Sequence, residues 1–407
     1  MAAATILTLT ALLGLTDPLV AFHAPSSHTL ASSGTDRSSS LGEHALTRLL
    51  SDASSVFGNS VEVQSNTSTW MESYADETLL VHMNIPGTHD AATWNYSLAT
   101  QQSLLHITAL VNDIEINPAA FRCQDRSMVD MLDAGIRAFD LRYAYDVTNT
   151  TLVFWHGPAI QSETATVDDV LYGFYHWLDQ HPSEALFLSF QYEGATSMHS
   201  VNNAGVQRML FNVLSSPVAR QYILQTTGSI GTLGEARGKI TLLKRFDFDM
   251  LPVSYTNELP GLHFSPASWI VNSPNITLLY NSTTGATAYI EDYYQPQTSA
   301  TSSYEENIKW KLNATEAHLR MAATMHPDSL FWSFASSTNL PNDPPVTPEI
   351  QALGLGNAST PDGGVNHRLV PFLEGMKGRR LGIVMFDFYE TPTDLLPLFL
   401  SLLPPGK

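Results

Sequence analysis

Three observations on the sequence predict an α/β protein built as a closed (β/α) barrel. Short apolar or β-branched runs alternate with amphipathic stretches over about 330 residues, which favours a parallel sheet connected by helices. Polar residues gather at the C-terminal ends of these runs, where barrel enzymes carry their chemistry. No glycine-rich phosphate-binding pattern follows any run, so the sequence gives no support for nucleotide binding.

The strands are expected where the apolar runs are short and end at polar or turn residues. These runs cover residues 79–85, 136–141, 152–155, 186–190, 239–244, 288–290, 330–334 and 381–386. The amphipathic stretches 167–180, 204–214 and 304–325 predict helices. The apolar stretch 395–403 directly follows the last run, so it is expected to be the final barrel helix and not a lipid-anchor signal.

The N-terminus has the features of a targeting segment. Residues 4–16 form an apolar run of the length found in cleavable secretory signals, and small residues follow near Ala21 and Ala24. No Lys or Arg precedes the run, so an ordinary apolar helix is the alternative. Sequons for N-glycosylation begin at Asn66, Asn95, Asn149, Asn275, Asn281, Asn313 and Asn357. We therefore expect a signal peptide over residues 1–24 and a secreted, extracellular glycoprotein.

The rest of the chain is expected to be a Ser/Thr-rich extension followed by one catalytic domain. Residues 25–75 have the composition of a leader, with a short helix over residues 43–50, and residues 76–404 carry the barrel. Lys and Arg number 20 against 39 Asp and Glu, so the net charge of −19 argues against nucleic acid as a partner. One cysteine, Cys123, excludes an intramolecular disulfide and a CxxC site.

Charged and imidazole side chains stand where several expected strands end. The first run continues into IPGTHD, which places His89 and Asp90 in a loop after the strand. In the second run, Asp140 and Arg142 are two residues apart and so share one face of the strand. A buried ion pair that braces the barrel is the structural alternative for Asp140. The third run ends directly at His156.

Two histidines and an arginine at strand ends indicate acid–base chemistry on a phosphodiester. One imidazole would remove a proton from a nucleophile while the other protonates the leaving oxygen. The guanidinium would neutralise a phosphoryl oxygen. Each imidazole needs a carboxylate to fix its tautomer, and Asp90 and Asp387 are the candidates.

The segments IPGTHD, GIRAFDLR, FWHG, GKITLLKRFD, YIEDYY and GIVMFD resemble, in this order, those of the phosphatidylinositol-specific phospholipase C X-domain family, in particular its bacterial, single-barrel branch. The resemblance spans about residues 79–389. It implies a distorted TIM (β/α)8 barrel and cleavage of the glycerol–phosphate bond of inositol phospholipids. It also implies transient contact with a membrane surface, which we assign to the aromatic loop 262–269, and we expect a monomer.

The resemblance also implies roles for individual residues. His89 resembles the general base on the inositol 2-hydroxyl and Asp387 its orienting carboxylate, while His156 resembles the general acid and Asp90 its partner. Arg142 resembles the phosphate-binding arginine that replaces a metal ligand of calcium-dependent relatives, so no metal or other cofactor is expected.

The headgroup pocket is expected to contain one departure from the bacterial pattern. Arg245, Asp292 and Tyr294 resemble the residues that bind the inositol ring. Gln191 stands where bacterial relatives carry a lysine, and its alternation with Phe190 along the strand directs it to the substrate side. Two alternatives stay open: an inactive headgroup-binding module, and a metal-dependent enzyme of the glycerophosphodiesterase or sphingomyelinase D type.

Overall fold

The fold was determined from a computed structural model, which describes residues 32–59, 65–107, 117–194 and 201–405. The chain divides into two compact units, Met1–Ala45 and Leu46–Lys407. The predicted signal peptide lies outside the described residues. Helix α1 (Ser32–Phe57) begins in the first unit and contains the shorter helix predicted over residues 43–50. Its last residues, including Val56 and Phe57, are buried in the second unit.

The second unit is built on a sheet whose strands follow the order β7-β6-β5-β2-β1-β11-β10-β9-β8. Neighbours along this path are parallel, except that β8 is antiparallel to β9. The strands on the path are β1 (Asn84–Thr88), β2 (Ala138–Tyr145), β5 (Ala185–Tyr192), β6 (Lys239–Arg245), β7 (Leu262–His263), β8 (Ser273–Asn281), β9 (Ala286–Asp292), β10 (Leu330–Phe334) and β11 (Gly382–Phe386). The predicted α/β class is confirmed, as a nearly closed barrel of mostly parallel strands.

Two further strands, β3 (Leu152–His156) and β4 (Ala159–Ile160), lie off this path. Strand β3 pairs antiparallel with β2, in a register that places Tyr143 opposite Phe154. The run 152–155 is therefore a strand, as predicted, but it belongs to a hairpin and not to the parallel barrel. Since β3 runs back along β2, its C-terminal end returns toward the barrel mouth.

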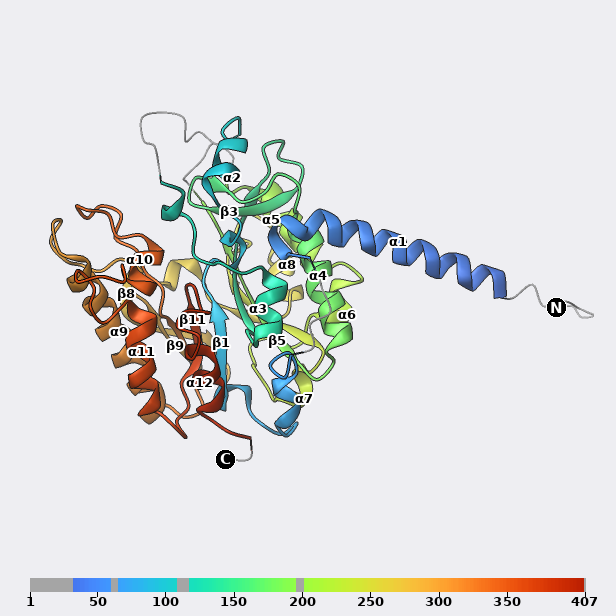
Figure 1. Ribbon diagram of the computed structural model, residues 1–407. Helices are drawn as coiled ribbons and strands as arrows, with labels where there is room; N and C mark the ends of the chain where they lie inside the picture. Colours follow the sequence, from blue (N-terminus) through green and yellow to red (C-terminus); the bar gives the residue numbers. More distant parts are fainter. Residues whose placement is uncertain (1–31, 60–64, 108–116, 195–200, 406–407) are drawn as a thin grey trace, which may run out of the picture. The chain divides into compact units, whose positions relative to one another are not determined.

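Helices lie on both sides of the strands, with α9, α11 and α12 on one side and α3, α4 and α6 on the other (Figure 1). The α-helices after α1 are α2 (Leu98–Ser103), α3 (Met128–Ala134), α4 (Val167–Gln180), α5 (Ala204–Leu214), α6 (Ala219–Tyr222), α7 (Leu233–Ala236), α8 (Val253–Glu258), α9 (Tyr304–Thr324), α10 (Pro348–Leu353), α11 (Val365–Glu374) and α12 (Leu395–Ser401). Helices α4 and α5 have the predicted bounds, and α12 is the expected final helix. None of the helices in the described part of the chain is long and apolar enough to cross a membrane.

The prediction of a strand over residues 79–85 is wrong in position. Residues Leu80–His82 form a 3-10 turn, and β1 runs from Asn84 through Pro86 and Gly87 to Thr88. Proline is tolerated here because β1 and β2 pair only from Gly87 onward, so the missing N–H of Pro86 lies before that ladder begins. The Pro86 carbonyl still accepts a hydrogen bond of 2.9 Å from the Arg137 backbone N–H.

The core has one layer inside the barrel and another between the strands and the helices. Ile85, Phe187 and Met385 belong to the inner layer, whereas Phe139 and Phe190 belong to the outer one. The inner layer is so tight at Gly87 that a Cβ there would collide with the Met385 sulfur and would meet Ala138 at 2.9 Å. Large apolar side chains therefore fill the barrel below its C-terminal end, and the polar residues of the strand ends are confined to the mouth.

Candidate active site

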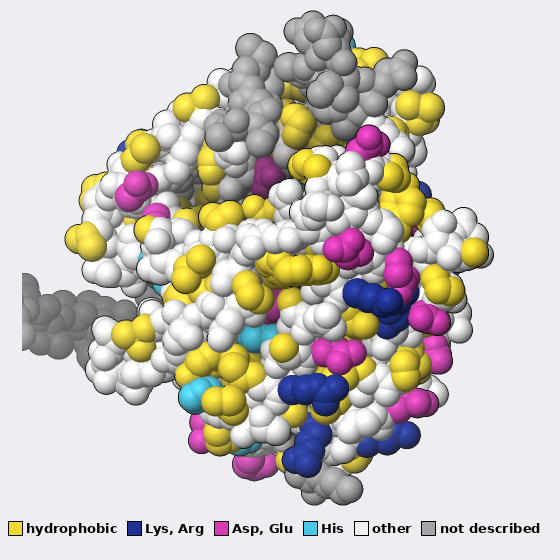
Figure 2. All heavy atoms as spheres, turned by 90° about the vertical axis from the view of Figure 1, so that its left-hand side faces the viewer, with side chains coloured by type: hydrophobic (Ala, Val, Ile, Leu, Met, Phe, Trp, Pro, Cys, Tyr) yellow, Lys and Arg dark blue, Asp and Glu magenta, His cyan; other side chains and the backbone are white. Residues whose placement is uncertain are grey.

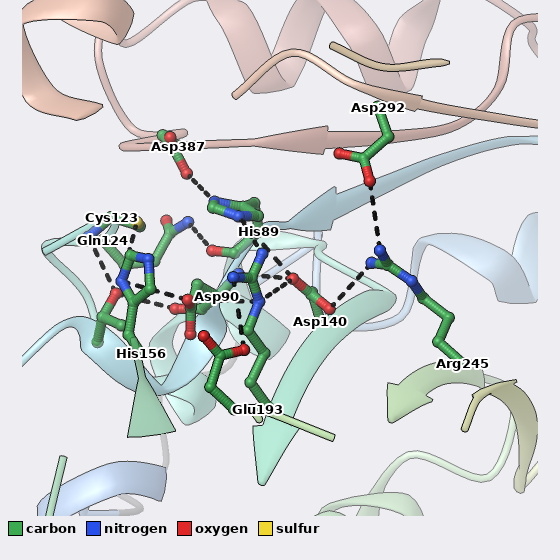
Figure 3. A network of polar contacts seen from close by, with 12 residues as sticks. His89, Asp90, Cys123, Gln124, Asp140, His156, Glu193, Arg245, Asp292 and Asp387 are labelled. Atoms are coloured by element: carbon green, nitrogen blue, oxygen red, sulfur yellow. Dashed lines mark hydrogen bonds and ion pairs between the residues drawn. The ribbon is translucent and has the colours of Figure 1, made fainter. Parts of the chain in front are cut away.

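The mouth of the barrel brings together the ends of β1 and β11. Thr88 pairs with Phe386, and the His89 backbone N–H donates to the Phe386 carbonyl at 3.1 Å. This register places the His89 ring beside Asp387, with 2.9 Å between Nδ1 and Oδ1 (Figure 3). Since Nδ1 donates to the carboxylate, Nε2 of the neutral ring is left as an acceptor.

Two arginines flank a glutamine along one rung of the sheet. Arg142 on β2 pairs in register with Gln191 on β5, which pairs in turn with Arg245 on β6. Arg142 Nη2 lies 2.6 Å from His89 Nε2, and its Nε donates to Asp140 Oδ2 at 3.2 Å. Asp140 also faces the second guanidinium, with 3.7 Å between its Oδ1 and Arg245 Nη1. The buried Asp140 thus links the two arginines.

His156 reaches the same mouth from the antiparallel hairpin. Its Nδ1 lies 2.9 Å from the carbonyl oxygen of Phe121 and 3.3 Å from Asp90 Oδ2. The rings of His89 and His156 are 6.3 Å apart, at right angles. The side chains of both histidines are largely buried but reach a cavity of about 370 Å³. Two imidazoles therefore face one space from different elements.

Asp90 lies behind this pair in a strained and enclosed position. Its backbone is left-handed, with φ 42° and ψ 56°, a region that Asp enters more readily than most residues. The residue is 0% exposed, and neither carboxylate oxygen has a hydrogen-bond partner. Its Oδ2 lies 3.5 Å from Arg142 Nε and 3.3 Å from His156 Nδ1.

Burial dominates the electrostatics of the site. It raises the pKa of Asp90 to about 8 and lowers the pKa of His156 to about 4, and the Arg142 charge lowers the latter further. In the free protein at neutral pH, the Asp90 carboxyl group is therefore protonated and His156 is a neutral imidazole. Burial also lowers the pKa of His89 well below its ordinary value of 6.5, with the Arg142 charge as the next contribution. His89 is therefore unprotonated at neutral pH, as a general base must be.

The other side of the cavity is lined by the predicted headgroup residues. Arg245 Nη2 donates to Asp292 Oδ2 at 3.3 Å, and the Trp269 indole donates to the same oxygen at 2.7 Å. The Arg245 guanidinium also stacks on Trp269, with 3.8 Å between its carbon and the ring centroid. Tyr294 lies just past the end of β9, is 37% exposed and lines the same cavity. The structure thus brings all the predicted headgroup residues, Gln191 included, to one space.

No protein-family model matches the chain. The curated 1-phosphatidylinositol phosphodiesterase of Listeria monocytogenes is 24% identical over 329 residues, which are 80% of this chain and 83% of that protein. Mouse PI-PLC X domain-containing protein 1 is 32% identical over 128 residues, only 36% of its own length. The solved phosphatidylinositol-specific phospholipase C of Staphylococcus aureus shares the fold, with a TM-score of 0.62 at 17% identity over 84% of this chain and 98% of that one. The Listeria structure gives a TM-score of 0.55 at 22% identity, over 82% and 97% of the two chains.

The chain is a distant homologue of the bacterial phosphatidylinositol-specific phospholipases C and the PI-PLC X-domain proteins.

In this phospholipase C homologue, four residues at the mouth were not among the predicted site residues. The sequence places Asp140 on the same strand face as Arg142 and leaves open that it forms a structural ion pair, and the spacing of two residues is the signal for its place at the mouth. Glu193, two residues after Gln191, accepts from the Gly157 N–H at 2.8 Å and lies 3.8 Å from Arg142 Nη1. Trp269 and Gln124 had no recognisable signal. The Gln124 side chain donates to the backbone carbonyls of His89 and Phe386 and so joins the loop after β1 to β11.

In this chain, the loop 262–269 does not offer the aromatic membrane contact expected from the sequence. Leu262 and Phe264 are fully buried in the inner core layer, and Trp269 packs on Arg245. The exposed apolar side chains come directly afterwards, at Ile270 (58%) and Val271 (73%). Val271 lines the cavity, so the apolar rim of the site begins where the predicted loop ends.

Proposed function

We propose that the protein is a secreted phosphoric diester hydrolase that cleaves inositol phospholipids between glycerol and phosphate without a metal. The observation that carries this proposal is the pair of buried His–Asp contacts, His89–Asp387 and His156–Asp90, on either side of Arg142. A metal-independent cleavage of a phosphodiester needs a base, an acid and a cation at one phosphorus atom, and these residues provide one of each.

In the first step, His89 accepts the proton of the inositol 2-hydroxyl through Nε2. The hydroxyl oxygen attacks phosphorus, and the bond between phosphorus and the glycerol oxygen breaks. Asp387 holds the ring through Nδ1 and stabilises the imidazolium that forms. Arg142, which lies 2.6 Å from His89 Nε2 in the free protein, turns its guanidinium to the phosphoryl oxygen when the hydroxyl takes its place at the imidazole.

In the same step, the His156–Asp90 pair delivers its proton to the leaving diacylglycerol oxygen. The phosphodiester anion makes protonation of His156 more favourable, so the proton held by Asp90 moves to the imidazole on binding. The products are diacylglycerol and a cyclic inositol phosphate. Arg245 and Asp292 bind ring hydroxyls, and Tyr294 packs on the sugar face.

The substrate would be reached at a membrane surface. Ile270 and Val271, exposed beside the cavity, form the contact we assign to the bilayer in place of the loop 262–269. Membrane binding is named in the description of a solved structure of the Staphylococcus aureus enzyme. On the face shown in Figure 2, Lys and Arg side chains lie among those of Asp and Glu. On α9, Lys309 pairs with Glu305 at 2.9 Å. Such interspersed charges support the view that nucleic acid is no partner.

Of the alternatives, the metal-dependent enzyme has the weaker support. Arg142 lies within 3.8 Å of Asp140 and Glu193, so its charge already occupies the position between the two carboxylates that a catalytic divalent ion beside the phosphate would need. An inactive binding module would not require two imidazoles with orienting carboxylates.

The test is the release of cyclic inositol phosphate from phosphatidylinositol vesicles in EDTA. We expect His89→Ala and His156→Ala each to lower kcat by about 10²–10⁴-fold, with little change in binding of the substrate. His106→Ala is the matched control, because that side chain is 63% exposed and lies outside the cavity. Near-wild-type rates in either site variant would remove the acid–base assignment. Loss of activity in EDTA that calcium restores would instead make Asp140 and Glu193 ligand candidates.

A further inference from the structure

Cys123, the single cysteine of the chain, lies between the two His–Asp pairs of the site. It is 0% exposed, and its sulfur is 4.0 Å from His156 Nδ1. The ligand atoms of Asp90, Cys123 and His156 all lie within 4.8 Å of one another, and the same holds for His89, Cys123 and Asp387. The proposed acid–base chemistry assigns no role to this thiol.

The backbone holds the thiol in place from two sides. The Cys123 N–H donates to Thr93 Oγ1 at 3.0 Å, and its carbonyl accepts from the Phe388 N–H at 3.0 Å. The next residue, Gln124, is tied to the backbone of His89 and Phe386. A ligand whose position is fixed before binding loses little conformational entropy on coordination.

A second, independent observation points to a cation at this position. Asp90 is 0% exposed, and both of its oxygens lack a hydrogen-bond partner, although a buried polar group without a partner is costly. Its Oδ2 lies 3.3 Å from the same His156 nitrogen that faces the Cys123 sulfur. A carboxylate, an imidazole and a thiolate are together the ligands that zinc prefers.

We propose that Asp90, Cys123 and His156 form a site for Zn²⁺ or a similar thiophilic divalent ion, and that occupation of this site inhibits the enzyme. Bond lengths of about 2.0–2.3 Å place the ligand atoms of a tetrahedral zinc site about 3.3–3.6 Å apart. The observed 3.3 Å between Asp90 and His156 already fits this spacing, and the 4.0 Å between Cys123 and His156 requires a shift of a few tenths of an ångström.

Binding of the ion is a proton exchange. The thiol loses its proton to become the thiolate ligand, the Asp90 carboxyl loses its proton, and the imidazole proton moves from Nδ1 to Nε2. Burial raises the pKa of the Cys123 thiol, so in the absence of an ion the sulfur stays protonated and unreactive. The bound ion occupies the His156 nitrogen and the Asp90 oxygens, so the pair can no longer deliver a proton.

The positive charge of Arg142 opposes the ion, but other carboxylates offset it. Arg142 Nε lies 3.5 Å from Asp90 Oδ2, and Asp140 and Glu193 lie 3.2 and 3.8 Å from the same guanidinium. Coordination at His156 Nδ1 replaces its 2.9 Å hydrogen bond to the Phe121 carbonyl. The other triad is less suitable, since an ion there would replace the His89–Asp387 hydrogen bond, and His89 is also in contact with Arg142 through Nε2.

Cobalt(II) is the probe, because a thiolate ligand gives it a near-ultraviolet charge-transfer band that does not depend on activity. We expect the full-length protein to develop this band, to saturate at one equivalent and to lose the band when Zn²⁺ is added. Cys123→Ser should abolish the band, and Asp90→Asn should weaken cobalt binding at least tenfold. Asp387→Asn should keep the band and the cobalt affinity of the wild type. Circular dichroism checks that each variant is folded.

The inhibitory effect rests on the proposed function and is measured separately. Zn²⁺ should lower the cleavage of phosphatidylinositol by the wild type, EDTA should restore it, and Cys123→Ser should keep the basal rate and lose at least tenfold in zinc sensitivity. No band in the wild type, or an unchanged band in Cys123→Ser, would overturn the site; loss of the band only in Asp387→Asn would overturn the assignment of its ligands. A cobalt band in a protein that never cleaves phosphatidylinositol would leave the metal site standing while the proposed function fails.

Discussion

Strand β2 is preceded by one arginine, Arg137, and contains another, Arg142, and the surroundings of the two differ. Arg137, just before the strand, is fully buried and uses every guanidinium nitrogen: it donates to Glu184 at 2.9 and 2.7 Å and to four backbone carbonyls. Glu184 in turn accepts from Ser183 at 2.8 Å. Arg142, at the mouth, faces three carboxylates, and Asp90 among them has no hydrogen bond on either oxygen.

The difference separates a structural pair from a functional one. At the closed end of the barrel, each donor and acceptor of the Arg137–Glu184 pair has a partner within the protein, so nothing is left to bind a ligand. At the mouth, unpaired atoms persist on Asp90, Asp140, Asp387 and Arg245. A protein retains such buried, incompletely satisfied groups where a substrate or an ion completes them.

Arg137→Lys should produce the largest effect, and it should be on stability. Lysine keeps the charge but has fewer donors than arginine. Several buried carbonyl oxygens therefore lose their donor, and Glu184 loses one of its two hydrogen bonds to residue 137. We expect the free energy of unfolding to fall by about 3–5 kcal/mol in denaturant titrations. The kcat of the folded fraction should stay unchanged, and a selective loss of kcat would contradict a purely structural role.

Arg142→Lys is the matched variant at the barrel mouth, and its effect should be on activity. The charge that Asp140 and Glu193 face is kept, whereas the planar fork toward the phosphoryl oxygen is lost. We expect kcat/KM on phosphatidylinositol to fall by about 10–100-fold, equivalent to about 1.4–2.7 kcal/mol. The free energy of unfolding should change much less than in Arg137→Lys. Equal losses of stability in the two variants would remove the distinction between the two ends.

Asp90→Asn should stabilise the protein while it lowers activity. Burial raises the pKa of Asp90 from 3.8 to about 8, so between these values the folded chain holds a proton that the unfolded chain has lost. Stability from this group therefore falls as pH rises from about 4 to about 8. An amide does not ionise, and Asn tolerates the left-handed backbone at this position.

With EDTA present, we expect Asp90→Asn to unfold with a free energy about 1–3 kcal/mol above that of the wild type at pH 8, and with a difference close to zero at pH 4. Thermal or denaturant unfolding at the two pH values measures this. A difference that does not change with pH would show that Asp90 does not hold a proton in the folded protein.

Gln191→Lys should produce the smallest effect, a gain in rate. Gln191 pairs in register with both Arg142 and Arg245. Carboxylates such as Asp140 face these two arginines, and their negative charge would also offset that of a third cation. A lysine there would act mainly on the charge that develops at phosphorus, so we expect kcat to rise about 3–10-fold, roughly 1 kcal/mol, with little change in KM. An unchanged rate in a folded variant would mean that the charge is supplied elsewhere or that the substrate is another phosphodiester.

Much of the fold could be predicted because the local signals agreed. Helices α4 and α5 have the predicted bounds, since amphipathic patterns coincide with strong N-caps at Thr166 and Asn203. Strands β4 and β7, two residues each, were missed because they are too short to carry a pattern. Strand β8 was missed because only two of its nine residues are buried, so it lacks the apolar run by which the other strands were recognised.

The site was predictable in its residue types and less so in its surroundings. Motifs after β1 and within β2 drew attention to His89 and Arg142, because charged groups beside apolar runs stand out. Trp269 and Cys123 had no such signal: the first belongs to a loop expected at the membrane, and the second served only to exclude disulfides. His156 was expected at the end of a parallel strand, but a local apolar run does not encode the direction of its pairing.

The order of residues specifies which chemical groups the chain carries. It also specifies which of them share a face of a strand, because side chains alternate with a period of two. Which of these groups come into contact depends on the fold. His89 and Asp387 are 298 residues apart, and Asp90 lies beside both His156 and Arg142. Such contacts are fixed by the register in which β1 joins β11 and by the return of the β3 hairpin, and no local pattern specifies them. Burial then shifts each pKa, since the cost of a charge depends on everything packed around it.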